Sequence, residues 1–239
     1  MNTYLQLRDK HKGQTAFILG CGPSLYSFYK SKKTCWGIFD TNVVIAVNSS
    51  IIMAVDKLKW YTGNDYYRYF ISNDSLCMRW SWWVKVQESK CIKIVRNSWE
   101  KYKDQLEGFL FFEPRPTKED VINSDDIGLA YCASIPSAID LSIQMGVKKI
   151  LLFGDDHCTL DGKDHFWQYF HVFKQPFQVR PAQGSFSQQK KVFDFSIGTY
   201  KALKEFADNK KCKIYNCSIN SELDIFEKIQ FDDYLKRKD

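Results

Sequence analysis

Short apolar segments alternate along the chain with segments that have the pattern of helices, and this alternation restricts the fold more than any other feature. The apolar runs TAFILG (15–20), NVVIAVN (42–48) and KKILLFGDD (148–156) have the length of strands, and each lies next to a helical segment. Parallel strands need crossover connections, usually helices, and are buried on both faces. The sequence therefore predicts an α/β fold with a mostly parallel sheet and helices on both of its faces.

The clearest helical segment is 134–146. Ser134 suits its N-cap, Pro136 suits its first turn, and Gly146 suits its C-terminal end. The other predicted strands are 59–65, 91–97, 108–114 and 212–218, and the other predicted helices are 23–32, 49–56, 197–210 and 221–229.

Residues 157–195 differ from the rest of the chain. They are rich in aromatic residues and glutamine, they hold three of the four histidines, and they are weakly periodic. A segment of this length without regular structure in a compact protein is usually a lid or a binding loop. The sequence therefore predicts a single α/β domain over 1–239, with a flexible lid inserted at 157–195.

Bulk properties exclude some classes of protein and leave others open. No apolar run has the length of a membrane span, and the polar N-terminus lacks the apolar segment of a secretory signal, so we expect a cytoplasmic protein. The eight cysteines include no CxxC pair, which favours reduced thiols over a metal cluster. The net charge of +6 is compatible with an acidic substrate but does not identify one.

Small and polar residues follow the predicted strands at their carboxyl ends. Ligands of open parallel sheets bind outside these ends. Residues that are far apart in the chain are therefore expected to meet at one rim of the sheet. This convergence predicts a nucleotide crevice. The residues are Gly20, Gly22, Ser24, Asn48, Asn64, Asp65, Asp155, Asp156, Asn216 and Ser218.

The turn GCGPS after the first strand has the composition of a phosphate-binding turn. Gly20 and Gly22 allow a close approach of the backbone to an anion, and Pro23 and Ser24 suit the start of a helix whose dipole favours negative charge. It is not a P-loop, because no Gly-Lys-Ser/Thr follows, and Leu25 stands where a dinucleotide fingerprint has its third glycine.

The segment FGDDHCTLDGKDHFWQYFH (153–171) is the richest in groups that take part in catalysis. Its carboxylates are suited to hold a Mg²⁺ ion that bridges phosphates, or to bind sugar hydroxyls. Its histidines are suited to remove a proton from an acceptor hydroxyl. A zinc site lacks the usual pair of histidines four residues apart with a glutamate. The groups are Asp155, Asp156, Asp161, Asp164, His157, His165 and His171.

The order of these motifs resembles two related families. ILGCGPSL, IAVNSS, ASIPSAIDLSIQMGVKKILLFGDD and CKIYNCSINSEL occur in this order over residues 16 to 225. Together they resemble the bacterial sialyltransferases and the 6-hydroxymethylpterin pyrophosphokinase-like proteins, which share the G-x-G-P-S-L signature. The resemblance covers nearly the whole chain.

Similarity to the sialyltransferases implies a Rossmann-like domain with a lid and metal-independent transfer of a sugar from a nucleotide. It implies a lid histidine as the general base, with His171 and His165 as the candidates. Two departures leave the nucleotide open: Cys21 stands where the sialyltransferases have Asn, and Ile135 stands where they have Gly. Nucleotide contacts are implied for Gly20, Gly22, Ser24, Asn48 and Ser134.

Three functions follow from this reading. The first is a glycosyltransferase that needs no cofactor beyond its nucleotide-sugar donor; its acceptor (a glycan, a lipid-linked oligosaccharide, a protein or a modified nucleic-acid base) and its oligomeric state stay open. The second, implied by the pyrophosphokinases, is Mg²⁺-dependent diphosphate transfer from ATP to a pterin-like alcohol, with Asp155 or Asp156 near the metal. The third is a non-catalytic nucleotide-binding protein. For the first, the predicted catalytic residues are His171, His165 and Asp156, and the predicted donor-binding residues are Gly20, Cys21, Gly22, Pro23, Ser24, Asn48, Asn64, Asp65, Ser134 and Asp155.

Overall fold

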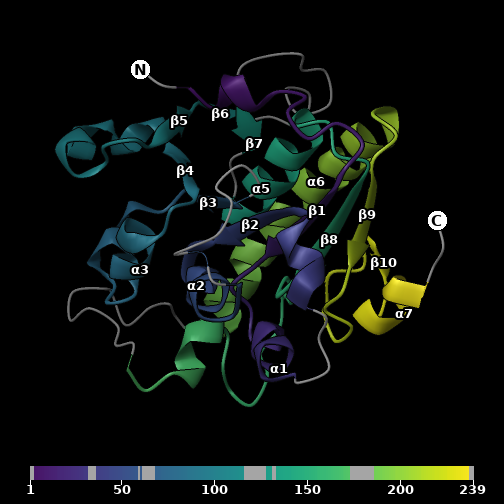
Figure 1. Cartoon of the computed structure of the whole chain (residues 1–239). Coiled ribbons are helices and arrows are strands. Elements are labelled where there is room, and N and C mark those ends of the chain that lie inside the picture. The colour runs from purple at the N-terminus through teal and green to yellow at the C-terminus, as the bar shows by residue number, and fades with distance from the viewer. Residues whose placement is uncertain are drawn as a thin grey trace.

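The chain forms a central parallel sheet with helices on both sides (Figure 1). The computed structural model describes residues 3–31, 36–58, 60, 68–115, 128–130, 133–172 and 186–236, without the side chains of 186–193. The strands are β1 (Thr15–Leu19), β2 (Val43–Val47), β3 (Arg68–Ser72), β4 (Ile92–Arg96), β5 (Leu110–Phe112), β6 (Pro114–Arg115), β7 (Leu129–Ala130), β8 (Lys149–Phe153), β9 (Lys213–Asn216) and β10 (Glu227–Lys228).

Eight of these strands form one sheet in the order β10-β9-β8-β1-β2-β3-β4-β5, and every neighbouring pair in it is parallel. The chain starts at β1 in the middle, continues to β5 at one edge, and then returns to β8 on the other side of β1. The order of the strands therefore reverses between β1 and β8, which is where α/β sheets bind their ligands. Strands β6 and β7 form a separate parallel pair.

Helices cover both faces of the large sheet, as the sequence predicts. One core cluster contains side chains from α5 and α6, and the other contains side chains from α1, α2, α3 and α7. The α-helices are α1 (Ser24–Lys30), α2 (Ile51–Leu58), α3 (Trp83–Glu88), α5 (Ser134–Gln144), α6 (Phe186–Asn209) and α7 (Phe231–Lys236). The 3-10 helices are η1 (Tyr4–Leu7), η2 (Trp36–Asp40), η3 (Asn48–Ser50), η5 (Ser75–Arg79), η6 (Asn97–Gln105) and η7 (Phe166–Tyr169).

The sequence of β2 explains why the sheet is buried on both sides. All five residues of VVIAV are buried. Successive side chains of a strand point to opposite faces, so Val43, Ile45 and Val47 join the core beneath α5, whereas Val44 and Ala46 join the core beneath α2. An uninterrupted apolar run is therefore the pattern of a central parallel strand.

Two predicted elements differ from the structure. The predicted third strand at 59–65 lies outside the described residues apart from Trp60, and the strand that pairs with β2 is β3, which the sequence analysis missed. Its apolar part is short, because it begins at Arg68, a buried side chain that pairs with Asp40 at 3.4 Å. The predicted helix over 221–229 is wrong: β10 lies there and pairs with β9.

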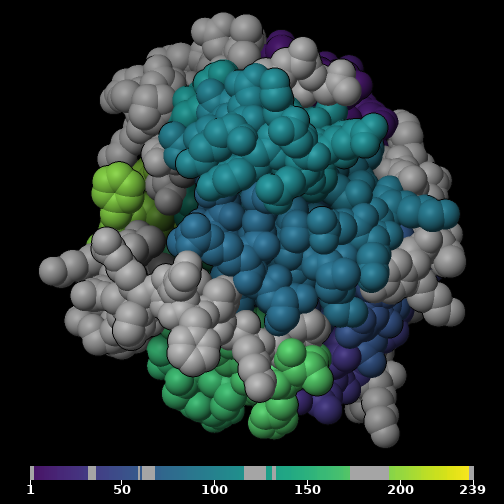
Figure 2. Space-filling model, turned by 90° about the vertical axis from the view of Figure 1, so that its left-hand side faces the viewer, coloured from purple at the N-terminus to yellow at the C-terminus, as the bar shows by residue number. Residues whose placement is uncertain are grey.

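The prediction that 157–195 lacks regular structure is wrong in part. Helix α6 begins at Phe186, and η7 lies within 157–172. Phe166 of η7 is fully buried, and its amide donates a hydrogen bond to the carbonyl of Cys21 at 2.7 Å. In Figure 2 the green surface of this segment lies below the blue and teal surface of the β3–β5 edge. Residues 173–185 lie outside the described residues, and the flexible lid stays a prediction.

Two further findings concern the helices. The N-cap of α5 is Ala133, and Ser134 is its first helical residue, so the predicted N-cap is displaced by one position. Gly146 follows the helix with φ of +78°, as a C-terminal glycine should. Within the described ranges, none of the helices combines the length and apolar character that a membrane crossing requires.

Candidate functional site

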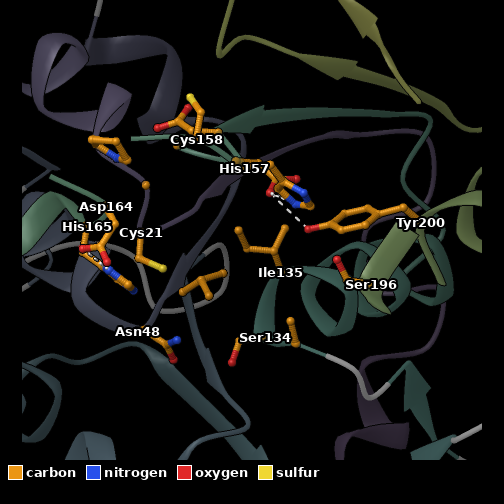
Figure 3. Close-up of a pocket in the computed structure, with 17 residues that line it drawn as sticks. Cys21, Asn48, Ser134, Ile135, His157, Cys158, Asp164, His165, Ser196 and Tyr200 are labelled. Carbon is orange, nitrogen blue, oxygen red and sulfur yellow. Dashed lines mark hydrogen bonds and ion pairs between the residues drawn. The ribbon is translucent and has the colours of Figure 1, made fainter. Parts of the chain in front are cut away.

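A cavity of about 250 Å³ lies at the carboxyl ends of β1, β2 and β8 (Figure 3). Its walls come from the turn after β1, from Asn48 after β2, from residues 154–158 after β8, from Asp164 and His165, from the start of α5 and from α6. The cavity therefore lies where the order of the strands reverses, and residues from both halves of the sheet line it. This position and these mixed polar and apolar walls are typical of a ligand site.

The glycines after β1 allow β1 and β8 to approach each other closely. A Cβ on Gly20 would lie 2.4 Å from the carbonyl oxygen of Gly154, and a Cβ on Gly22 would lie 2.6 Å from Asp156 Oδ2. The amides of Gly20 and Gly22 donate to the carbonyls of Phe153 and Gly154 at 2.6 and 2.8 Å. These amides are already paired within the protein, so the predicted use of both glycines to cradle a phosphate is not what the geometry shows.

The carboxylate of Asp156 occupies the start of α1, where an anion was predicted. The amide and the hydroxyl of Ser24 donate to its two oxygens at 2.7 and 2.5 Å. Burial raises the pKa of Asp156, and the hydrogen bonds from Ser24 act against that effect. Asp156 lines the cavity, but this pairing with the backbone gives it a structural task in joining α1 to β8, which differs from the predicted catalytic one.

The neighbouring carboxylate, Asp155, points to a different set of partners. The hydroxyl of Tyr200 donates to Asp155 Oδ1 at 3.0 Å, and Nε2 of His157 lies 3.4 Å from the same oxygen. His157 has a φ of +53°, and its ring packs edge-on against Tyr200 with 5.3 Å between the centroids. Asp155 is 2 % exposed, and its second oxygen, Oδ2, has no hydrogen-bond partner among the described residues.

His165 lies in the wall of the cavity beside a carboxylate. Its Nδ1 is 2.9 Å from Oδ1 of Asp164, and Gln168 Oε1 accepts hydrogen bonds from the amides of both residues at 2.8 and 2.9 Å. Burial acts to raise the pKa of Asp164, but the hydrogen bond and charge of His165 and further hydrogen bonds outweigh it and lower this pKa. The ring is thus held by a charged partner, in the arrangement that orients many catalytic histidines.

The wall formed by α5 and the turn after β2 carries uncharged polar groups. Asn48 has a φ of +50°, and the thiol of Cys77 donates weakly to its Oδ1 at 3.7 Å. Ser134 Oγ accepts a hydrogen bond from the amide of Asn73 at 2.9 Å, which fixes its hydroxyl at the start of α5. The amides at the start of a helix have no partner inside it, and the helix dipole makes this end favourable for anions.

Cys21 lines the cavity as a neutral thiol. Burial raises its pKa to about 12, and the charges of Asp155, Asp156 and Asp164 contribute further to the rise. A thiol reacts as a nucleophile in its ionised form, so Cys21 is not an activated nucleophile near neutral pH. Asp155, Asp156 and Asp164 also line the cavity.

The structure brings together most, but not all, of the predicted site residues. Gly20, Ser24 and the exposed His171 do not line the cavity, and Asn64 and Asp65 lie outside the described residues. The predicted residues in the lining are Cys21, Gly22, Pro23, Asn48, Ser134, Asp155, Asp156 and His165.

Sequence reasoning missed several lining residues because it placed the start of α6 too late. Ser196 and Tyr200 are four residues apart on α6 and therefore share a helix face, a signal that a helix beginning at 197 does not contain. The other lining residues outside the predicted site are Val47, Ala133, Ile135, Gly154, His157, Cys158 and Asp164, of which His157 and Asp164 were named only as groups suited to catalysis.

Among the described residues, the two aspartates after β8 have no third ligand with which to form a metal site. Asp156 pairs with Ser24, and Asp155 pairs with Tyr200 and His157. Across the part of the chain that the structure describes, no three His, Cys, Asp or Glu side chains gather in a way that could hold a metal ion.

Comparison with known proteins finds similar solved structures only. No family model matches the chain, and no curated protein matches it. The sialyltransferase CstII from Campylobacter jejuni, solved with the substrate analogue CMP-3FNeuAc, is 16 % identical over 90 % of this chain and 86 % of that chain, with a TM-score of 0.45. The sialyltransferase CST-II with a trisaccharide acceptor and CMP is 17 % identical over 90 % and 85 % of the two chains, with a TM-score of 0.42. Likenesses of this size do not place the chain in a family.

Proposed function

We propose that the chain is a glycosyltransferase that moves a sugar from a nucleotide-sugar donor to an acceptor hydroxyl, with His165 as the general base. The observation that carries this proposal is the pairing of His165 with Asp164 in the wall of a cavity at the point where the order of the strands reverses. Of the two histidines predicted for this role, His165 is favoured because His171 does not line the cavity.

The pairing with Asp164 supports proton transfer at the other ring nitrogen. A carboxylate next to Nδ1 keeps the proton on that nitrogen, so Nε2 is the basic atom. Figure 3 shows His165 between Asp164 and the interior of the cavity, near Cys21. When Nε2 takes a proton, the charge of Asp164 stabilises the imidazolium, as in other catalytic pairs of histidine and carboxylate.

The donor phosphate is assigned to the start of α5 and not to the glycine turn. Asp156 already occupies the start of α1, whereas Ser134 and Ile135 open α5 at the cavity wall. The lining contributed by described residues contains no Lys or Arg. Helix amides and the Ser134 hydroxyl would therefore stabilise the negative charge that develops on the leaving phosphate.

The first test is binding. Thermal shift with CMP, UDP, GDP and ATP, each with and without Mg²⁺, should show stabilisation by one donor class without a need for the metal. A failure of all four nucleotides to raise the melting temperature contradicts the proposal and favours a protein without this chemistry. A turnover that EDTA abolishes contradicts the metal-independent mechanism and favours the Mg²⁺-dependent diphosphate transfer.

The second test is the His165→Ala substitution. The variant should bind the nucleotide as the wild type does, and its kcat should fall about 10²- to 10⁴-fold, which is the usual contribution of a general base. His171→Ala is the matched control and should keep its kcat, because this histidine lies outside the cavity wall. If His165→Ala transfers sugar at the wild-type rate, His165 is not the base.

A further inference from the structure

Asp155 is a buried carboxylate with one oxygen satisfied and the other not. Its Oδ1 accepts from Tyr200 and lies beside His157, while its Oδ2 is buried without a hydrogen-bond partner among the described residues. Its backbone is also fixed, because the amide donates to Ser218 and the carbonyl accepts from Ser221 at 2.7 Å. Turning the side chain toward another donor would break the contacts of Oδ1 with Tyr200 and His157.

A buried carboxylate oxygen without a partner, on a residue that lines a cavity, indicates a hydrogen-bond donor on the ligand. Leaving a buried acceptor unpaired costs about 1 to 3 kcal/mol, and more for a charged group. Asp155 lines the cavity, so a ligand with a correctly placed donor would recover this free energy on binding. The protein without ligand thus already holds the acceptor of this hydrogen bond in place.

The charges around Asp155 decide which group of the ligand can lie next to it. Asp156 and Asp164 line the same cavity, and the described lining contains no Lys or Arg. A phosphate next to Asp155 would meet this negative field without a Lys or Arg to offset it, whereas a hydroxyl would donate to the carboxylate without adding charge. Figure 3 shows His157 and Tyr200 on one side of Ile135 and Ser134 and Asn48 on the other, so the cavity has a carboxylate side and a helix-end side.

We infer that Asp155 Oδ2 accepts a hydrogen bond from a sugar hydroxyl of the ligand, and that the ligand lies with its hydroxyl-bearing ring toward Asp155 and its phosphate toward the start of α5. Tyr200 and His157 act as positioning residues, because they hold Oδ1 and so direct Oδ2. The inference rests on the proposed function for the identity of the ligand. Either the ribose of the nucleotide or the transferred sugar can supply the hydroxyl.

The experiment measures dissociation constants by calorimetry for wild type, Asp155→Asn and the control Asp161→Asn. Asp161 lies in the same segment, is exposed and does not line the cavity. The probes are CMP and UDP, their 2′-deoxy and 3′-deoxy analogues, CMP-N-acetylneuraminate, UDP-glucose, free ribose and inorganic phosphate. Asparagine keeps an acceptor for Tyr200 and removes the charge, so the fold should be retained.

Two results support the inference and identify the source of the hydroxyl. If the ribose supplies it, a deoxy analogue should bind the wild type about 10- to 100-fold more weakly than its parent, which corresponds to one hydrogen bond to a charged group. This preference should disappear in Asp155→Asn and persist in Asp161→Asn. If the transferred sugar supplies the hydroxyl, the wild type should bind the nucleotide sugar more tightly than the nucleotide. Asp155→Asn should then lose this preference.

Other results overturn the inference or the proposed function separately. If nucleotides bind and Asp155→Asn binds every probe as tightly as the wild type, the inference is wrong while the proposed function stands. If free ribose binds in an Asp155-dependent manner but no nucleotide binds, the proposed function is wrong while the inference stands. No binding of any probe overturns both. Should Asp155→Asn fail to fold, equal affinities of the wild type for the nucleotide sugars, the nucleotides and their deoxy analogues overturn the inference.

Discussion

At the scale of single residues, Gly22 has no space for a side chain. Its position is set by the carbonyl of Gly154 and by the carboxylate of Asp156, which lie 2.7 and 2.6 Å from where a Cβ would be. Both are held by other contacts: Gly154 accepts the amide of Gly22 itself, and Asp156 is bonded to Ser24. Neither neighbour can move without breaking one of these hydrogen bonds.

We therefore expect Gly22→Ala to destabilise the fold by about 1 to 3 kcal/mol, the usual cost of placing extra atoms in a packed region. Denaturant unfolding followed by circular dichroism measures it. Gly37→Ala is the control, because a Cβ at Gly37 meets no atom within 4 Å. Equal unfolding free energies for Gly22→Ala and the control would show that the turn can open without cost.

Residue identity predicts that the pair Asp155–Asp156 belongs to a site, but not which task each residue has. Adjacent side chains at the end of a strand point in different directions. Asp156 turns to Ser24 on α1, and Asp155 turns to Tyr200 on α6. The register of β8 against its neighbours decides this division, and a single sequence does not specify contacts between residues 45 and 132 positions apart.

At the scale of elements, the segment 157–172 is anchored to the rest of the molecule by aromatic packing. Phe166 is fully buried, and the rings of Tyr26 on α1 and Tyr169 on η7 stack with 4.1 Å between their centroids. His165 directly precedes Phe166. The position of the proposed base therefore depends on how well η7 packs against α1.

Phe166→Ala should lower the free energy of unfolding by about 3 to 5 kcal/mol, as for other buried Phe to Ala changes. It should also reduce sugar transfer, because the cavity left by the ring loosens the segment that carries His165. Unfolding in denaturant and steady-state kinetics measure the two effects. Val172→Ala, at a side chain 76 % exposed, is the control and should change neither. A stable and fully active Phe166→Ala variant would contradict the anchoring role.

The elements that were predicted correctly have patterns that depend on local sequence. Strands β1, β2 and β8 are apolar runs, and α5 has its glycine at the end. The elements that were missed depend on distant contacts. Strand β3 begins with Arg68, which pairs with Asp40. The segment 221–229, predicted as a helix, is held instead by a distant contact, because the hydroxyl of Ser221 donates to the carbonyl of Asp155.

At the scale of the whole molecule, buried thiols link stability to alkaline pH. Burial raises the pKa of Cys212 and Cys217 to about 12. Burial and, to a smaller extent, the charges of nearby carboxylates raise the pKa of Cys21 to about 12 as well. Unfolded cysteines ionise with their ordinary pKa near 8.5. Above that pH the unfolded state holds fewer protons than the folded state, so stability falls as pH rises.

We expect the melting temperature to fall between about pH 9 and pH 12, beyond the fall that other groups cause. Cys212→Val and Cys217→Val should each make this fall less steep, and the double variant should reduce it further. Scanning calorimetry under reducing conditions measures the slopes. Slopes that do not change in the double variant would show that these thiols do not contribute to the effect.

The reversal of the strand order between β1 and β8 also determines when the binding cavity can exist. The wall after β1 is completed by residues after β8, and beside that wall Ser218 Oγ accepts a hydrogen bond from the amide of Gly154 and lies 3.1 Å from the hydroxyl oxygen of Ser24. Residues that touch beside the cavity are thus separated by almost two hundred positions in the chain. During synthesis the first five strands of the large sheet can pair early, whereas the cavity must wait until Tyr200, the last described residue of its lining in chain order, has left the ribosome. Ligand binding would then be a late event in folding and a direct report that the C-terminal part of the sheet has been added.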